Sequence, residues 1–559
     1  MPGHAPSIFR FGLGIGDGDG ANQSLFYSRR VGRAPQGRAH PQGGWVDRPA
    51  ESRILGAWKL SGKTSNGWSV GVLNAVTGRE DARVATVSGE RHSTAVEPLT
   101  NYAVTRVQRD FRNGNSALGA VATGVNREEV VAHDLGLRTG AYTGGVDARH
   151  RFGDGHIQLN VNLLASHVRG STGAIEATQR SPIRYYQRPD APHLSLDPTR
   201  TSLSGWSSTL ELWKMGGGNW RWATGTQWRS PGFEANDAGF MTEGDFRAVF
   251  GFVGYVQNEP GKHLRSWRVN TSAWSNWTFG NEHTSLGGNV NGNVQFMNNW
   301  SAYGGINRQA EGLSTTQLRG GPAMVREASW NGWSGLNTDD RKAVQGNLGF
   351  NWNVRPESNS HSWNTNANLR WNPSSQIQLR AGPFVSRRVE DQQWGGLITT
   401  EAGPHYLLGR LDQTTVGMTA RADLAISPTL TLQLYAQPFL SSGDYGEFKE
   451  VVAPRSELYQ DRFRLLETQE DGRLYRVDLN GDGPLESFAN PDFRVGQFRS
   501  NLVLRWEYRP GSTLFLVWAQ ARDDFQARGE FQLGDGVSDL FGHQPENVFM
   551  VKFNYWLTP

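Results

Sequence analysis

The chain contains no cysteine among its 559 residues. This absence rules out disulfide frameworks, thiolate metal sites and cysteine nucleophiles, and with them zinc ribbons, iron–sulfur proteins and thiol enzymes. Export is not excluded, because exported proteins need not carry disulfides.

Excess charge and long apolar runs are also lacking. The 56 basic and 53 acidic side chains leave a net charge of +3, which is too small at this length for a general nucleic-acid binder. No segment approaches the roughly 20 consecutive apolar residues of a membrane-spanning helix. Residues 1–14 show neither a basic start nor an apolar signal core. We therefore expect either a chain that is not exported or a later portion of a longer exported product.

What the sequence does contain is strict alternation of apolar and polar residues, which recurs from about residue 50 to the C-terminus and predicts β-strands. Segments 347–355 and 362–371 place leucine and tryptophan on one face, and asparagine and arginine on the other. The same alternation recurs at 157–163, 430–437 and 549–557. We expect a sheet with one apolar face and one amide-rich or charged face.

Three features favour a membrane sheet over a soluble β-sandwich. The alternating segments reach about 10 to 13 residues, which matches a tilted membrane strand, whereas soluble strands most often have about 5 to 6. Tryptophans cluster toward strand ends, as in the aromatic girdles of membrane barrels. Glycines within strands let a large sheet bend, as barrel closure requires. These glycines are Gly71, Gly119, Gly144, Gly145, Gly287, Gly288 and Gly346.

Connection lengths supply an independent test, because outer-membrane barrels alternate short periplasmic turns with long external loops. Read back from the C-terminus, long connections at 523–546, 441–496 and about 388–408 alternate with short ones at 509–512, 427–429 and 372–375. The alternation becomes ambiguous upstream, where 356–360 and 278–282 are both brief.

These patterns predict an all-β fold: a large antiparallel transmembrane β-barrel of about 20–24 strands in the bacterial outer membrane. We expect an N-terminal segment at 1–48 that is periplasmic, luminal or a first strand, and a barrel at 49–559 with a long external loop at about 441–496. A lumen of this size holds water, a plug or inserted loops.

Several phrases resemble the family called domain of unknown function 5916. They are NQSLFYSRRVGRAPQGR (22–38), EPLTNYAVTRVQRDF (97–111), SPGFEANDAGFM (230–241), DYGEFKEV (444–451) and LRWEYRPGSTLFLVW (504–518). The resemblance implies an outer-membrane barrel of a Gram-negative bacterium, often preceded by a carbohydrate-binding family 9-like module. Because SIFRFGLG at 7–14 resembles the start of the barrel region, we expect a fragment, a truncated product or a separately encoded barrel. The resemblance carries over no catalytic or binding residue.

One metal site is predicted, for calcium, at Asp478, Asn480 and Asp482. Their alternate spacing before a glycine forms the first half of a calcium loop. Position twelve is Ala489 rather than glutamate, so Glu486 or Asp492 would have to substitute. The alternative is a solvated surface turn.

A basic cluster lies near the N-terminus, at Arg29, Arg30, Arg33 and Arg38. Arginine forks match oxyanions, so the cluster would attract anions at a constriction or engage lipid phosphates. The alternative is a solvated segment.

No catalytic residue is predicted, because HExxH and GxSxG motifs are absent. Three functions stay open: a conduit or receptor for polar ligands such as glycans, a surface anchor for a carbohydrate-binding module, and an outer-membrane hydrolase. The expected partners are outer-membrane lipid, glycans or other polar small molecules, and the barrel-assembly machinery, with no nucleic acid.

Overall fold

The computed structural model describes residues 11–13, 23–40, 43–481, 483 and 485–556. Contacts divide the chain into two units. Unit 1 comprises residues 1–254, 272–286 and 313–323, and unit 2 comprises 255–271, 287–312 and 324–559. The division passes through the strands β12 (Phe246–Gln257), β13 (Leu264–Trp277), β14 (His283–Phe296) and β16 (Gly312–Ser314).

The secondary structure of unit 1 is mainly strand. Its other strands are β1 (Trp45–Asp47), β2 (Ile54–Lys63), β3 (Trp68–Thr77), β4 (Glu80–Ala85), β5 (Arg91–Glu97), β6 (Thr100–Phe111), β7 (Ser116–Arg127), β8 (Arg138–Phe152), β9 (Ile157–Gly170), β10 (Ser202–Lys214) and β11 (Trp220–Arg229). Its helices are short: η1 (Ser28–Arg30), α1 (Glu129–Asp134) and α2 (Thr172–Gln179). Ser171 caps α2, because its hydroxyl accepts the backbone N–H of Ala174 at 3.3 Å.

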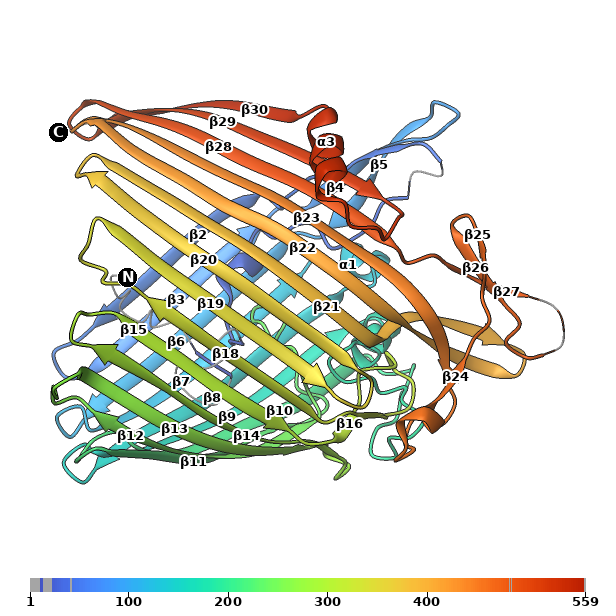
Figure 1. The fold of residues 1–559 in the computed structure, drawn as a ribbon, viewed down its shortest axis with the longest axis horizontal. Helices are drawn as coiled ribbons and strands as arrows, with labels where there is room; N and C mark the ends of the chain where they lie inside the picture. Colours follow the sequence, from blue (N-terminus) through green and yellow to red (C-terminus); the bar gives the residue numbers. More distant parts are fainter. Residues whose placement is uncertain (1–10, 14–22, 41–42, 482, 484, 557–559) are drawn as a thin grey trace. The chain divides into compact units, whose positions relative to one another are not determined.

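Unit 2 holds the longest strands. Its strands are β15 (Ser301–Gln309), β17 (Met324–Arg326), β18 (Ser329–Asn337), β19 (Val344–Arg355), β20 (Ser360–Ser374), β21 (Ile377–Thr400), β22 (Gly403–Ser427), β23 (Leu430–Val451), β24 (Phe463–Leu465), β25 (Gln469–Asp471), β26 (Leu474–Val477), β27 (Glu486–Ala489), β28 (Phe493–Arg509), β29 (Ser512–Gln526) and β30 (Glu546–Asn554). Its helices are η2 (Tyr459–Arg462) and α3 (Leu533–Gly542). In Figure 1, β28, β29 and β30 run side by side, as their registers require.

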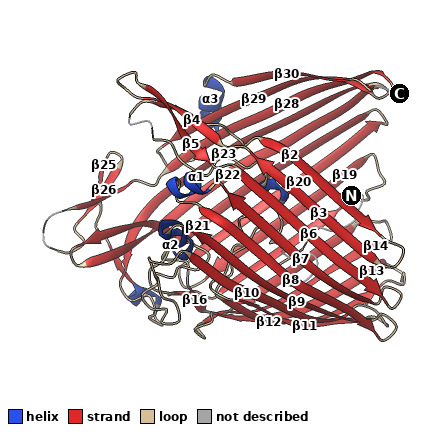
Figure 2. Cartoon of the chain, turned by 180° about the vertical axis from the view of Figure 1, so that it is seen from behind, coloured by secondary structure: helices blue, strands red, loops and turns tan. Residues whose placement is uncertain are grey.

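Most of the strands form a large antiparallel sheet and pair within it in chain order. Three small sheets are separate from it: β1 with β4 and β5, β16 with β17, and β25 with β26 and β27. The predicted all-β class and large antiparallel sheet are confirmed, and Figure 2 shows how little of the chain is helical. Among the described residues, no helix has both the length and the apolar character needed to cross a bilayer.

Every second connection between the long sheet strands is short. These turns, of two to six residues, are 64–67, 112–115, 153–156, 215–219, 258–263, 297–300, 338–343, 375–376, 428–429 and 510–511. Most of the intervening connections are long and carry small elements, such as α2 before β10, β25 to β27 before β28, and α3 before β30. The short turns expected near 372–375, 427–429 and 509–512 are confirmed.

The prediction of a long loop at about 388–408 is wrong. β21 and β22 stay paired as far as Thr400↔Gly403, so both strands continue through this segment and turn at residues 401–402. Register shifts occur between Glu390 and Gln393 and between Trp394 and Gly396. Such bulges insert residues that break period-two alternation, which is why the sequence pattern did not show a strand.

The two faces of the unit 2 strands differ as the alternation predicts. Trp352 pairs with Trp363 on the apolar face, and Asn351 pairs with Asn364 on the polar face. Side chains on the apolar face are exposed, Leu348 by 56% and Val551 by 70%. Much of this apolar face is therefore left uncovered by the chain.

A buried apolar cluster of unit 2 lies instead where β25 to β27 pack on extensions of β22 and β23. Phe448 contacts the rings of Tyr475 and Phe488, with centroids 4.8 and 4.9 Å apart. Leu407, Leu466, Val477 and Leu479 complete this cluster. Burial raises the pKa of Tyr475 to about 12, with the nearby Asp492 charge adding to the rise.

Candidate binding site on the polar face of the sheet

The polar face of unit 2 carries a ladder of asparagine side chains. Asn270 donates to Asn291 at 2.9 Å, and Asn307 donates to Asn331 at 2.6 Å. Further along the sheet, Asn347 donates to Asn337 at 2.7 Å. An amide group both donates and accepts hydrogen bonds, so neighbouring amides hold one another in place and keep capacity for a ligand.

The ladder leads to a pocket of about 500 Å³ on the same face. This volume falls within the ~300–1,000 Å³ of small-molecule sites. The polar residues lining it are Asn337, Thr338, Asp340, Gln345, Asn347, Asn368, Arg370, Arg380, Thr419 and Arg421. They come from β18 to β22 and from the turn at 338–343. Strand pairing brings these residues together across more than 80 positions of sequence.

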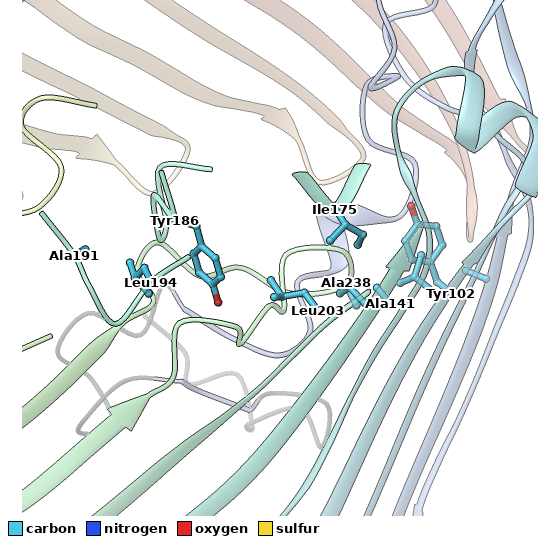
Figure 3. Close-up of a cluster of buried hydrophobic side chains, with 11 residues drawn as sticks. Tyr102, Ala141, Ile175, Tyr186, Ala191, Leu194, Leu203 and Ala238 are labelled. Atoms are coloured by element: carbon cyan, nitrogen blue, oxygen red, sulfur yellow. The ribbon is translucent and has the colours of Figure 1, made fainter. Parts of the chain in front are cut away.

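Unit 1 differs, because part of its sheet is covered by inner segments. A row of residues directly opposite one another across six strands is buried: Ala75, Tyr102, Val125, Ala141, Val168 and Leu203. Ile175 of α2, together with Tyr186, Leu194 and Ala238, packs against this row. Figure 3 shows Tyr102, Ala141 and Leu203 of this row together with Ile175, Tyr186, Leu194 and Ala238.

The segment 230–245, one of these inner segments, lies very close to the strands it covers. A Cβ on Gly205 of β10 would lie 2.0 Å from the backbone nitrogen of Phe233, and one on Gly232 would lie 2.1 Å from the carbonyl oxygen of Ser204. Only glycine at both positions lets the two backbones approach this closely. The backbone N–H of Glu234 also donates to the Ser166 hydroxyl of β9 at 2.9 Å.

Buried ion pairs fix the carboxylates of this segment. Asp237 lies 2.9 Å from Arg127 and 2.9 Å from Arg138, and Glu234 lies 2.8 Å from Arg184. Burial alone would raise the pKa of Asp237, but Arg138 and Arg127 hold it well below its usual range. The pKa of Glu234 is lowered for the same reason, by Arg138 and Arg184. We call these five side chains the clamp.

A second buried polar cluster lies in unit 2. Lys449 of β23 contacts Asp391 of β21 at 2.5 Å, and Tyr459 of η2 hydrogen-bonds to the same carboxylate. Gln392 donates to Glu327 at 2.7 Å. Sequence reasoning missed both clusters, because their members are far apart in the chain and form no motif.

The predicted calcium residues lie in the connection between β26 and β27. The carboxylate of Asp478 accepts the backbone N–H of Gly481 at 2.7 Å and that of Gly483 at 3.0 Å, and Glu486 accepts that of Leu479 at 3.0 Å. Asp482 lies outside the described residues. Among the described residues, no three aspartate, glutamate or histidine side chains group as metal ligands. Calcium binding stays a prediction.

The N-terminal arginines lie in different surroundings. Arg30 donates to the carbonyl of Gly239 at 2.8 Å and to Asn236 at 3.2 Å, so it helps hold the segment 230–245. Burial lowers the pKa of Arg33, which lies near Tyr102, Arg127 and Asp237. Arg29 and Arg38 are exposed.

The protein is therefore of the all-β class and is built on a large antiparallel sheet. One face of this sheet is apolar and exposed, and the other carries amides, arginines and a ligand-sized pocket. Its sequence matches the family described as Domain of unknown function (DUF5916) over residues 21–558. The chain belongs to this family, and the predicted resemblance is confirmed. No match is found among curated proteins.

The solved structures that the chain matches include transporters and a porin. The anion-selective porin from Comamonas acidovorans is 11% identical, with a TM-score of 0.28, over 59% of this chain and 91% of the porin. The apoprotein form of the FrpB iron transporter from Neisseria meningitidis is 8% identical, with a TM-score of 0.38, over 82% of this chain and 73% of the transporter. The copper transporter OprC is 10% identical, with a TM-score of 0.31, over 86% of this chain and 77% of OprC.

Proposed function

We propose that the chain is an outer-membrane β-barrel that conducts or receives polar solutes such as glycans. The observation that carries this proposal is the pair of opposite faces in unit 2. Phe549 and Val551 on the apolar face of β30 are 76% and 70% exposed, although buried residues elsewhere show that the chain can cover apolar groups. A contiguous exposed apolar face fits contact with lipid.

Lipid contact in turn requires the sheet to close. Backbone N–H and C=O groups at a sheet edge have no water to bind within a bilayer, so a lipid-facing sheet is stable only as a barrel. The tryptophans support the same placement. Trp371 and Trp506, each about half exposed, lie near the ends of β20 and β28, where an aromatic girdle would meet the interface.

The polar face would then line the lumen. The asparagine ladder and the pocket offer paired donors and acceptors at fixed positions, and sugar hydroxyls need this combination. In unit 1 the inner segments cover part of the polar face, so they would narrow or gate the passage. In the cell, such a barrel would depend on the barrel-assembly machinery for insertion.

Planar-bilayer recording of the purified full chain tests the proposal. We expect discrete conductance steps, with current noise or block when a neutral oligosaccharide such as maltohexaose is added. The folded protein should also migrate on gels in a heat-modifiable way. A chain that remains a folded monomer in buffer without detergent would refute the membrane assignment, and an inserted barrel without current would refute the conduit.

A further inference from the structure

Three arginines lie directly opposite one another on the polar face of unit 2. In the strand registers, Arg370 of β20 pairs with Arg380 of β21, and Arg380 pairs with Arg421 of β22. All three are exposed and all three line the pocket. We call them the arginine row. Like charges directly opposite one another destabilise a sheet unless something of opposite charge joins them.

Other arginines on the same strands have carboxylate partners. Arg387 of β21 contacts Asp412 at 2.7 Å, and Arg388 contacts Glu390 at 3.0 Å. By contrast, no carboxylate in the described part of the chain lies within 4.0 Å of a guanidinium nitrogen of the arginine row. Asp340 also lines the pocket, so the lining holds three positive side chains and one negative.

Neighbouring groups orient the row without neutralising it. Arg380 donates to the side-chain oxygen of Gln378, and the guanidinium of Arg421 lies 5.1 Å from the ring centroid of Tyr435. Both contacts restrict a long side chain and leave its positive charge in place, and they also leave N–H groups free for a ligand. A partly ordered guanidinium loses less freedom when it binds.

We propose that the arginine row binds an oxyanion: a carboxylate, sulfate or phosphate group carried by the solute. This inference rests on the proposed function for its physiological meaning and extends it, because it makes the preferred solute acidic. Adjacent strands lie about 4.8 Å apart, so one oxyanion fits between two guanidiniums with forked hydrogen bonds. The amides of Asn347 and Asn368 in the same pocket would hold adjacent hydroxyl groups.

Isothermal titration calorimetry of the detergent-solubilised full chain tests binding without relying on conductance. The probes are sodium pyrophosphate and trigalacturonate, with maltotriose as the neutral comparison. We expect both acidic probes to bind and Arg380→Gln to weaken their binding about tenfold, the effect of losing one charged hydrogen-bonding partner. Asp340→Asn should strengthen it, because it removes the negative side chain of the lining.

Arg387→Gln is the matched control. It removes an arginine from the same strand, but the side chain of Arg387 lies on the opposite face of the sheet and forms an ion pair with Asp412. Heat-modifiable migration of each variant checks that it folds. Equal affinity of wild type and Arg380→Gln, or equal loss in Arg387→Gln, would overturn the proposal. Preference for pyrophosphate over trigalacturonate would identify free phosphates as the ligand class, and the reverse would identify acidic sugars.

Bilayer recording separates this inference from the proposed function. In a potassium chloride gradient, the reversal potential should show anion preference in wild type and a shift toward zero in Arg380→Gln. If the chain conducts ions but shows no anion preference and binds no acidic probe, the conduit proposal stands and the oxyanion site is overturned. Acidic-probe binding without conductance would leave the oxyanion site and overturn the conduit.

Discussion

The clamp on the segment 230–245 gives the sharpest test of the inner layer in unit 1. Asp237→Asn removes the charge that neutralises Arg127 and Arg138 but keeps the size of the side chain. Asp237 is about 5% exposed and Arg127 about 1%, so Arg127 would be left charged in a site that water barely reaches, whereas Arg138 is about 19% exposed. We expect the segment to detach from the strands more often.

The free-energy cost of this substitution depends on how deeply the ion pair is buried and on which contacts of the arginines remain. Removing one partner of a buried ion pair costs about 3–5 kcal/mol. The amide oxygen of asparagine still accepts one hydrogen bond, and Glu234 stays 3.5 Å from Arg138, so we expect about 3 kcal/mol. At about 1.4 kcal/mol per tenfold change, the detached population rises roughly a hundredfold.

Limited proteolysis of the folded protein in detergent measures this population, because cleavage follows the open fraction when reclosing is fast. Cleavage within 230–245 should accelerate about a hundredfold in Asp237→Asn. Asp197→Asn is the control, since Asp197 lies on another inner segment but forms an exposed pair with Arg200. Cleavage of Asp237→Asn at the wild-type rate, or equal acceleration in the control, would refute the role of the clamp.

Three further predictions concern other parts of the chain. The pKa values of Glu234 and Asp237 are lowered, so the clamp stabilises the fold fully above the pKa of about 4 that these carboxyls have in the unfolded chain, and this stabilisation is lost as the pH falls further. Protection from proteolysis should therefore be constant between about pH 5 and 8 and decline below about pH 4. Val551→Arg should lower the unfolding free energy in lipid vesicles by about 2–4 kcal/mol, whereas Met550→Arg, on the opposite face of β30, should have a much smaller effect in the same urea titration. Calcium added after chelation should slow proteolysis between β26 and β27 in wild type but not in Asp478→Ala; equal rates in both would contradict the calcium site.

The sequence predicted the strands well wherever the two faces differ. The pairing of Trp352 with Trp363 and of Asn351 with Asn364 follows directly from period-two alternation in two consecutive segments. The extended hairpin of β21 and β22 was missed because bulges and buried polar residues such as Asp391 interrupt the pattern. A period test detects a strand only while the alternation is unbroken.

The candidate site was predicted in kind but not in detail. Amide-rich faces were visible in the sequence, but the opposition of Arg370, Arg380 and Arg421 depends on registers across three strands, and these depend on the exact turn positions. The structural role of a glycine is also hard to predict from the sequence alone. Gly119 was read as allowing curvature, but a Cβ there would lie 2.6 Å from both Arg106 and Asp147, so this glycine makes room for an ion pair.

One signal for the inner layer was present in the sequence. In β9 the polar face begins with Gln158, Asn160 and Asn162 and then changes to Leu164 and Val168, with Ser166 between them. The opposite face is apolar as far as Ala165, so both faces are apolar around residues 163–165. A strand that is apolar on both faces over part of its length must be covered on both faces there. In this chain the second cover is the inner layer, since Leu164 and Val168 are buried whereas Leu163 is 53% exposed. The point where alternation gives way to two apolar faces therefore marks where an inner segment packs on a sheet of this kind.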